Sequence, residues 1–245
     1  MLSEKNWRPD AVGRLMLGIV VSVMVGIILS DALQPLLRGL NTADVQLIQF
    51  AIATASFQGA TLVLVGVFLR AQHLSWADAF GLGTAARLGR TLGLTAATSL
   101  IILVGGLVLG SGSAELMRWC GLTPEPQLAV QIVETTESPL RTSFFGLVAV
   151  VLAPAAEEVL FRGLIYPTLK QMGHRQVALW LTSVLFAASH FSMLAFIPLV
   201  FVALMLTLLY ETTNNLLAPI VAHSLFNLTN LFLLIFEGMI APMGR

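Results

Sequence analysis

Charged residues are scarce in this sequence, and cysteine is almost absent. Only 11% of the 245 residues are charged, whereas an average soluble domain carries roughly 25%. Thirteen acidic and thirteen basic side chains are too few to cover a soluble protein of this size. Their net charge of zero gives no indication of a nucleic-acid partner. The single cysteine, Cys120, excludes an intrachain disulfide and a metal site built from cysteines.

Apolar residues make up 57% of the sequence, and the mean hydropathy is +0.87. Runs of about 20 apolar residues recur along the chain, and each is long enough to cross the hydrocarbon core of a bilayer. We therefore predict an all-α, polytopic transmembrane helix bundle in contact with membrane lipid, with about seven spans. The predicted spans are Gly13–Leu37, Val45–Leu69, Leu88–Leu109, Ser143–Leu169, Val177–His190, Leu194–Tyr210 and Leu216–Phe236.

One connection, Gly110–Thr142, is longer than the others. It contains a Gly-Ser-Gly-Ser sequence, three prolines and four glutamates, a composition typical of a loop outside the membrane. The loop divides one integrated membrane domain into parts. Residues 1–142 hold three helices and this loop, residues 143–236 form a four-helix core, and residues 237–245 are a short tail.

Basic residues predict the orientation, because Lys and Arg are enriched in cytoplasmic loops. With the N-terminus in the cytoplasm, the cytoplasmic segments hold eight basic residues and the opposite side holds four. This bias favours a cytoplasmic N-terminus. The short N-terminus and the lack of an organelle-targeting segment favour the bacterial inner membrane as the location.

Ionisable side chains within the predicted spans are the informative exceptions, because each costs several kcal/mol in hydrocarbon and normally faces a cavity or a partner. The fourth span contains Glu157, Glu158 and Arg162. Glu158 and Arg162 are four residues apart, so we expect an ion pair on one helix face. Glu157 lies about 100° further round the helix and is left for another role, such as a general base. A neutralised helix end, with Glu157 reaching water, is the structural alternative.

Two later spans also carry polar side chains. His190 ends the fifth span, and His223 and Asn227 are four residues apart on the seventh. Each cluster by itself fits hydrogen bonding between packed membrane helices. Counted from the cytoplasmic ends of their spans, Glu157 and His190 both lie roughly 20 Å deep, and His223 and Asn227 lie about 12 and 18 Å deep. These four side chains fall in one slab of the membrane, which independent packing residues have no reason to share.

The same residues occur in the order and spacing of a known family. The motifs are Glu-Glu-x-x-x-Arg at residues 157–162, Phe-x-x-x-His at 186–190 and His-x-x-x-Asn at 223–227, all within 71 residues. In these motifs the sequence resembles the CPBP family of intramembrane proteases, also called the Abi family, which includes CAAX proteases and bacteriocin-processing enzymes. The resemblance covers roughly Ser143 to Phe236, and the first three helices match only in being hydrophobic.

The resemblance implies an intramembrane endopeptidase that cleaves a membrane-associated peptide or protein near its C-terminus. By motif position, Glu157 would be the general base and would hold the attacking water together with His190. His223 and Asn227 would polarise the scissile carbonyl and stabilise the oxyanion. The pair Glu158–Arg162 would support the site and fix the orientation of the helix.

The resemblance leaves two readings of metal use open. The family is grouped with metalloproteases, and Glu157, His190 and His223 would supply three ligands to a zinc ion, with a fourth position for water. A water activated by glutamate alone needs no ion and uses the same side chains. We expect the metal-independent chemistry, with zinc as the alternative cofactor.

Two other classes of function also remain open. Proton-coupled transporters use buried Glu, His and Arg residues, but they usually have paired halves with broken helices in matching positions, and the sequence shows no such symmetry. A non-catalytic membrane scaffold would keep the fold and lose the chemistry. The intact motifs argue against a scaffold, because a lapsed site would be free to lose the costly buried Glu157.

Overall fold

The computed structural model describes residues 7–82, 88–125, 127, 130–131 and 138–240, and all regular secondary structure in these residues is helical. The predicted all-α, polytopic bundle is therefore confirmed. The helices are α1 (Pro9–Leu37), α2 (Thr42–Thr54), α3 (Ala60–Ala71), α4 (Trp76–Phe80), α5 (Leu88–Trp119), α7 (Pro139–Leu147), α8 (Ala153–Glu158), α9 (Tyr166–Lys170), α10 (Arg175–Ala188), α11 (Met193–Thr213) and α12 (Leu217–Ile240).

Stretches of π-helix join some of these helices into longer rods. The segment η2 (Ala55–Gly59) joins α2 to α3. The segments η4 (Val148–Leu152) and η5 (Val159–Ile165) join α7, α8 and α9 into one rod, Pro139–Lys170, which we call the motif helix. Single π-helical turns inside α-helices are frequent at functional sites. The glutamates of the first motif lie between two of them.

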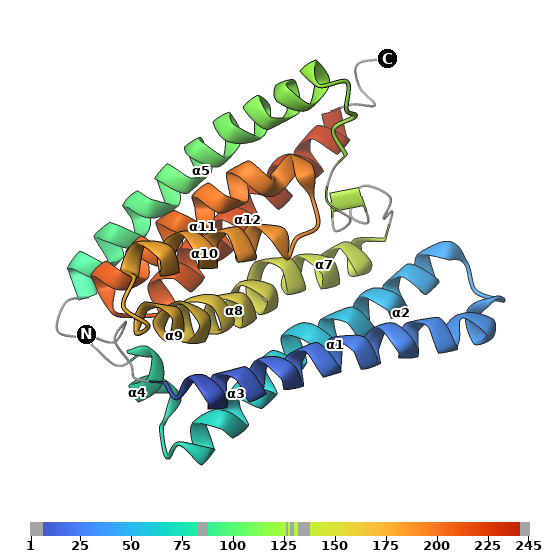
Figure 1. The fold of residues 1–245 in the computed structure, drawn as a ribbon. Helices are drawn as coiled ribbons and strands as arrows, with labels where there is room; N and C mark the ends of the chain where they lie inside the picture. The colour runs from blue at the N-terminus through green and yellow to red at the C-terminus, as the bar shows by residue number, and fades with distance from the viewer. Residues whose placement is uncertain (1–6, 83–87, 126, 128–129, 132–137, 241–245) are drawn as a thin grey trace.

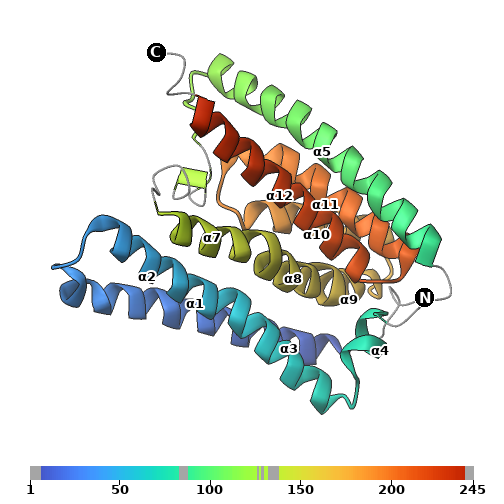
Figure 2. The same ribbon diagram turned by 180° about the vertical axis from the view of Figure 1, so that it is seen from behind.

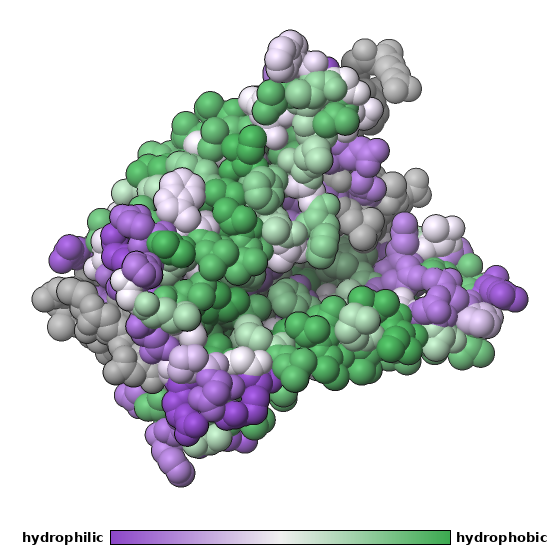
Figure 3. Space-filling model, in the orientation of Figure 1, coloured by the Kyte–Doolittle hydropathy of each residue, from purple (hydrophilic) through white to green (hydrophobic). Residues whose placement is uncertain are grey.

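Within the described residues, six rods are long and apolar enough to cross a membrane, so the chain is an integral membrane protein. The fifth predicted span corresponds to α10, which is apolar but has only 14 residues. Figure 3 shows a hydrophobic surface along the helices with hydrophilic patches toward their ends. The six rods are Pro9–Leu37, Thr42–Ala71, Leu88–Trp119, Pro139–Lys170, Met193–Thr213 and Leu217–Phe236.

The helix α5 is longer than the sequence predicts. The predicted loop begins at Gly110, but the helix continues through the Gly-Ser-Gly-Ser sequence to Trp119. The Ser111 hydroxyl donates to the carbonyl of Leu107 in the same helix, so a small polar residue is accommodated there without ending it. The helix ends before Gly121, whose φ of 73° is the left-handed conformation common after helix ends. Much of the remaining predicted loop, including 132–137, and the tail from 241 lie outside the described residues.

The helices form two groups on either side of the motif helix (Figures 1 and 2). One group is α1 with the α2–η2–α3 rod, which also contacts α8 through η2. The other group contains α10, α11 and α12, and α5 packs against both α11 and α12. The third predicted span therefore lies with the C-terminal helices in space, although it precedes the long connection in the sequence.

Residues before α1 and in α4 bind the end of the motif helix. The Trp7 indole N–H donates to the carbonyl of Gly163 at 3.0 Å, and the Trp7 carbonyl accepts from the Gln171 amide at 2.7 Å. The Phe80 ring packs so closely on Gly163 that a Cβ there would lie 2.7 Å from it. The carbonyl of Phe80 also accepts from the Leu216 N–H at 3.0 Å. These contacts join the N-terminal group, the motif helix and the α11–α12 turn.

Candidate active site

The two adjacent glutamates of the motif helix have different surroundings. Glu158 is completely buried, and its Oε1 lies 2.8 Å from Nη1 of Arg162, which is also completely buried. This is the ion pair that the four-residue spacing predicts. The Glu157 side chain retains 12% of its exposure. The arrangement therefore leaves Glu157 as the accessible carboxylate of the two.

The other N–H groups of the Arg162 guanidinium also have partners. Its Nε donates to the Thr207 hydroxyl at 3.3 Å, and its Nη2 donates to the carbonyl of Ala203 at 3.0 Å. The guanidinium carbon lies 4.7 Å from the centre of the Phe186 ring. A buried charge is tolerated only when it is paired and its N–H groups are satisfied. Arg162 therefore links the motif helix to α10 and α11.

His223 of α12 lies beside both glutamates. Its Nδ1 is 2.9 Å from Glu158 Oε1, and its Nε2 is 3.9 Å from Glu157 Oε2. Because the ion-paired carboxylate of Glu158 is an acceptor, the Nδ1 of His223 carries a proton. The imidazole is buried, so its Nε2 is held facing Glu157. Residues 65 positions apart in the sequence thus form one row of Glu157, His223 and Glu158.

His190 lies just beyond α10, which ends at Ala188, instead of within the predicted fifth span. Its Nδ1 is 2.8 Å from the carbonyl of Phe186, so this nitrogen is the donor and Nε2 is left as an acceptor. The next residue, Phe191, has a φ of 49° and a side chain that is almost fully exposed. Positive φ is an outlier for a bulky residue and often marks a functional segment.

Phe186 connects the three motifs. Its ring is completely buried, and its centroid lies 4.8 Å from the His190 ring and 5.7 Å from the His223 ring. The two imidazoles therefore lie on one phenylalanine, no further apart than those two distances together. Arg162 covers the same ring. In the sequence Phe186 is only the first residue of the Phe-x-x-x-His motif, and its position four residues before His190 is the signal for its role.

Asn227 ties α12 to the motif helix. Its Nδ2 donates to the carbonyl of Ala149 at 2.8 Å, and Ala149 lies in η4. This bond uses one of the two amide hydrogens, so a second N–H and the amide oxygen remain. The nearby Asn230 instead bonds to the carbonyl of Phe226 in its own helix. The six predicted site residues therefore lie on the motif helix, on α12 and just beyond the end of α10.

The donor types of Glu157, His190 and His223 suit zinc. In both histidines Nδ1 is engaged with an oxygen atom, which leaves Nε2 for a metal, as is common in metal sites. In the described part of the chain, however, no three His, Cys, Asp or Glu side chains converge closely enough to hold a metal ion. As they stand, these three side chains are not placed to share one metal ion. Zinc stays a prediction.

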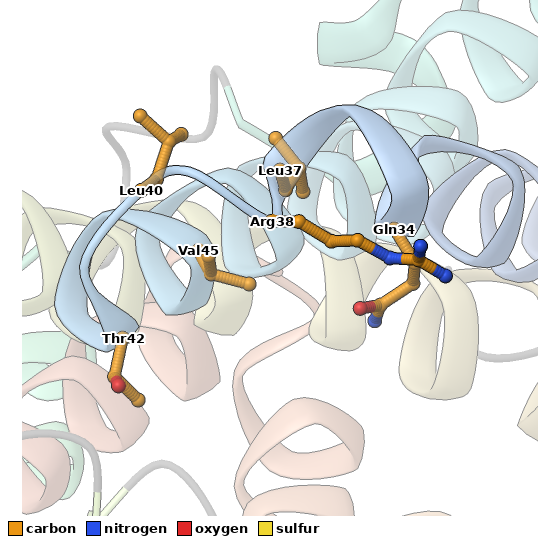
Figure 4. Close-up of a pocket in the computed structure, with 6 residues that line it drawn as sticks. All are labelled: Gln34, Leu37, Arg38, Leu40, Thr42 and Val45. Atoms are coloured by element: carbon orange, nitrogen blue, oxygen red, sulfur yellow. The ribbon is translucent and has the colours of Figure 1, made fainter.

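Two hollows lie on the surface of the described residues. An apolar groove of about 640 Å³ runs between the end of α5 and the start of α11, and it is lined by Ala188 and Phe191 on either side of His190. A smaller hollow of about 240 Å³ lies at the turn between α1 and α2 (Figure 4). It is lined by Gln34, Leu37, Arg38, Leu40, Thr42 and Val45, and therefore by no motif residue.

Comparison with known proteins agrees with the motif assignment. Residues 139–229 match the family of type II CAAX prenyl endopeptidases, Rce1-like, and this stretch contains all six candidate site residues. The resemblance to the CPBP intramembrane proteases is thereby confirmed for this part of the chain. A curated relative, the uncharacterized protein YpbD of Bacillus subtilis (strain 168), is 38% identical over 77 residues, which are 30% of this chain and 36% of the relative. The chain thus spans little more than a third of that relative's length. No solved structure matches the chain.

Proposed function

We propose that this chain is an intramembrane endopeptidase in which Glu157 is the general base. The observation that carries the proposal is the position of His223, which links the accessible Glu157 to the fully buried pair of Glu158 and Arg162. A buried ion pair with an additional imidazole is costly to maintain in a membrane helix. This cost is explained if the buried pair holds Glu157 and the imidazole of His223 in a reactive geometry.

The proposed reaction uses one water molecule. Glu157 and the Nε2 of His190 hold this water, and Glu157 accepts its proton as the oxygen attacks the scissile carbonyl. The protonated Glu157 then donates that proton to the leaving nitrogen, which breaks the C–N bond and restores the carboxylate. Water is thus added across the amide, and no further reactant is required.

The negative oxygen that forms in this step needs donors. The second amide N–H of Asn227 can serve, because the first is bound to the carbonyl of Ala149. His223 can donate from Nε2 only as an imidazolium, with its Nδ1–H on Glu158. The Glu158 carboxylate stabilises that imidazolium, so the pair of Glu158 and Arg162 would act through His223.

The proposed substrate is a membrane-associated peptide, because five of the six candidate residues lie on helices long and apolar enough to span a bilayer. The test uses the purified protein in lipid nanodiscs with a pool of lipid-anchored peptides of varied C-terminal sequence. We expect cleavage by the wild type and a loss of roughly 100- to 10,000-fold in Glu157→Gln, the range for a general base. The matched control is Glu115→Gln on the exposed surface of α5, which should cleave normally.

Further variants test the other roles. His190→Ala should also lose cleavage, and Asn227→Ala should lose roughly 100- to 1000-fold if it is one oxyanion donor. A chelator should leave the rate unchanged, and a chelator loss that zinc restores would favour the metal reading. Normal cleavage by Glu157→Gln would contradict the proposal. A proton flux in proteoliposomes that survives Glu157→Ala, without cleavage by the wild type, would favour a transporter.

A further inference from the structure

The rod α2–η2–α3 has polar residues on a buried face. Thr54, Gln58 and Thr61 follow one another at spacings of four and three residues, so they lie on one side of the rod. Thr61 is completely buried, and Thr54 retains only 8% of its exposure. These residues precede the matched stretch 139–229, and neither the motifs nor the family match gives them a role. Buried polar groups in a membrane helix usually serve packing or function.

Gln58 lies on the side of the rod opposite the one that contacts α1 at Ser56. Ser56 marks the side that faces α1, because a Cβ on Gly26 would lie 2.3 Å from its hydroxyl. Gln58 is two residues further, roughly half a turn round the helix, and so lies on the opposite side. Besides its own rod and α1, η2 packs against α8, the segment that carries Glu157 and Glu158.

Two polar atoms on this face lack a partner within the described residues. They are Oε1 of Gln58 and Oγ1 of Thr61, and Oε2 of Glu158 and Oγ1 of Thr182 are two more such atoms elsewhere in the described residues. A threonine in a helix can bond to a carbonyl of the preceding turn, as Thr95 of α5 does to Thr91 at 2.8 Å. Thr61 follows a π-helical turn and makes no such bond. A buried polar atom without a partner is costly and calls for a physical explanation.

We propose that Gln58 and Thr61 form a subsite that hydrogen-bonds the backbone of the bound peptide beside the scissile bond. This inference rests on the proposed endopeptidase function. An extended peptide in hydrocarbon has no water for its N–H and C=O groups, so the protein must supply partners. The Gln58 amide offers an acceptor and two donors, and the Thr61 hydroxyl offers both roles. Because every residue has the same backbone, this subsite accepts peptides of different sequence.

The test crosses enzyme variants with backbone variants of one peptide. The peptide is the one that the wild type cleaves best from the lipid-anchored pool. Its analogues replace, one at a time, an amide near the scissile bond by an ester, which removes a single N–H. Gln58→Leu and Thr61→Val should each raise KM by roughly 10- to 100-fold with little change in kcat, because they remove substrate binding and not chemistry.

Non-additive effects on KM identify the hydrogen bond between an enzyme side chain and the peptide backbone. One ester should raise KM in the wild type and have no further effect in the variant that lost the matching acceptor, because the two changes remove the same contact. Additive losses at every ester position, or an unchanged KM in both variants, would overturn the subsite. Thr95→Val is the control, since it removes a buried threonine hydroxyl that is satisfied within its own helix. Its KM should equal that of the wild type.

A binding measurement separates failure of the subsite from failure of the proposed function. A fluorescent lipid-anchored peptide is titrated into nanodiscs that contain Glu157→Gln alone or Glu157→Gln combined with Gln58→Leu. Weaker binding to the double variant supports the subsite even if the wild type cleaves no peptide, in which case only the endopeptidase reaction is wrong. Equal affinity for the two proteins would overturn the subsite whether or not the wild type is a protease.

Discussion

The helix α1 and the motif helix have similar lengths, 29 and 32 residues, but very different surroundings. α1 is the more hydrophobic of the two, yet a much smaller share of it is buried within the protein than of the motif helix. α1 exposes large side chains such as Leu17, Val20 and Ile28, which suit contact with lipid. The motif helix buries Glu158 and Arg162. The charged helix is the one that protein encloses, because only protein supplies partners for charges within a membrane.

This difference predicts that replacing a charged residue costs more stability where its ion pair is buried than where it is exposed. Arg162→Met leaves Glu158 buried without its partner, which typically destabilises a protein by about 3–5 kcal/mol. Arg118→Met, in an exposed pair with Glu115 on α5, should leave stability unchanged. Unfolding of both variants in detergent can be followed by circular dichroism. Similar losses in the two variants would show that burial does not decide the cost.

A smaller loss is expected where the N-terminal group meets the motif helix. Gly163→Ala places a methyl group 2.7 Å from the Phe80 ring, and overpacking of this kind costs about 1–3 kcal/mol. Gly110→Ala is the matched control, because a Cβ there meets open space on the helix α5. Phe80→Leu should partly relieve Gly163→Ala in the same unfolding measurement. If Gly163→Ala were as harmless as Gly110→Ala, the close packing of Phe80 would be wrong.

The hydrogen bond of Trp7 should contribute less. Trp7→Phe keeps an aromatic ring but removes the N–H that binds the carbonyl of Gly163, and a neutral hydrogen bond contributes about 1 kcal/mol. Trp119→Phe, at an exposed position on α5, should change nothing. Hydrogen exchange should also rise at the end of the motif helix in Trp7→Phe alone. Exchange that is equal in both variants would contradict a role for Trp7 in holding this end.

The smallest effect is expected at the opposite end of the motif helix. Arg141 pairs there with Asp44 of α2, and both side chains are partly exposed. A double-mutant cycle with Asp44→Asn and Arg141→Gln should give a coupling of about 0.2–1 kcal/mol that falls as salt is added. A coupling as large as the stability loss in Arg162→Met, and independent of salt, would show that the partly exposed pair stabilises the protein as much as the buried one.

The local features were predictable from the sequence, and contacts between helices were only partly so. The apolar runs predicted seven helices, and the spacing of Glu158 and Arg162 predicted their pairing, since both features depend on a single helix. The extension of α5 beyond Gly110 was missed, because glycine and serine are read as loop formers although a packed membrane helix accommodates them. The position of His190 beyond α10 was also missed, because helix ends depend on the surrounding packing.

The sequence by itself determined that the chain is a membrane helix bundle and which side chains are too polar for lipid, because hydropathy and spacing depend on neighbours along the chain. Only the tertiary structure decided that Phe186 would connect the two histidines and that Trp7 and Phe80 would pack on Gly163. It also decided that Oε1 of Gln58 and Oγ1 of Thr61 would be buried without a partner in the described residues. Such contacts join residues far apart in the sequence, and they depend on how whole helices pack in three dimensions.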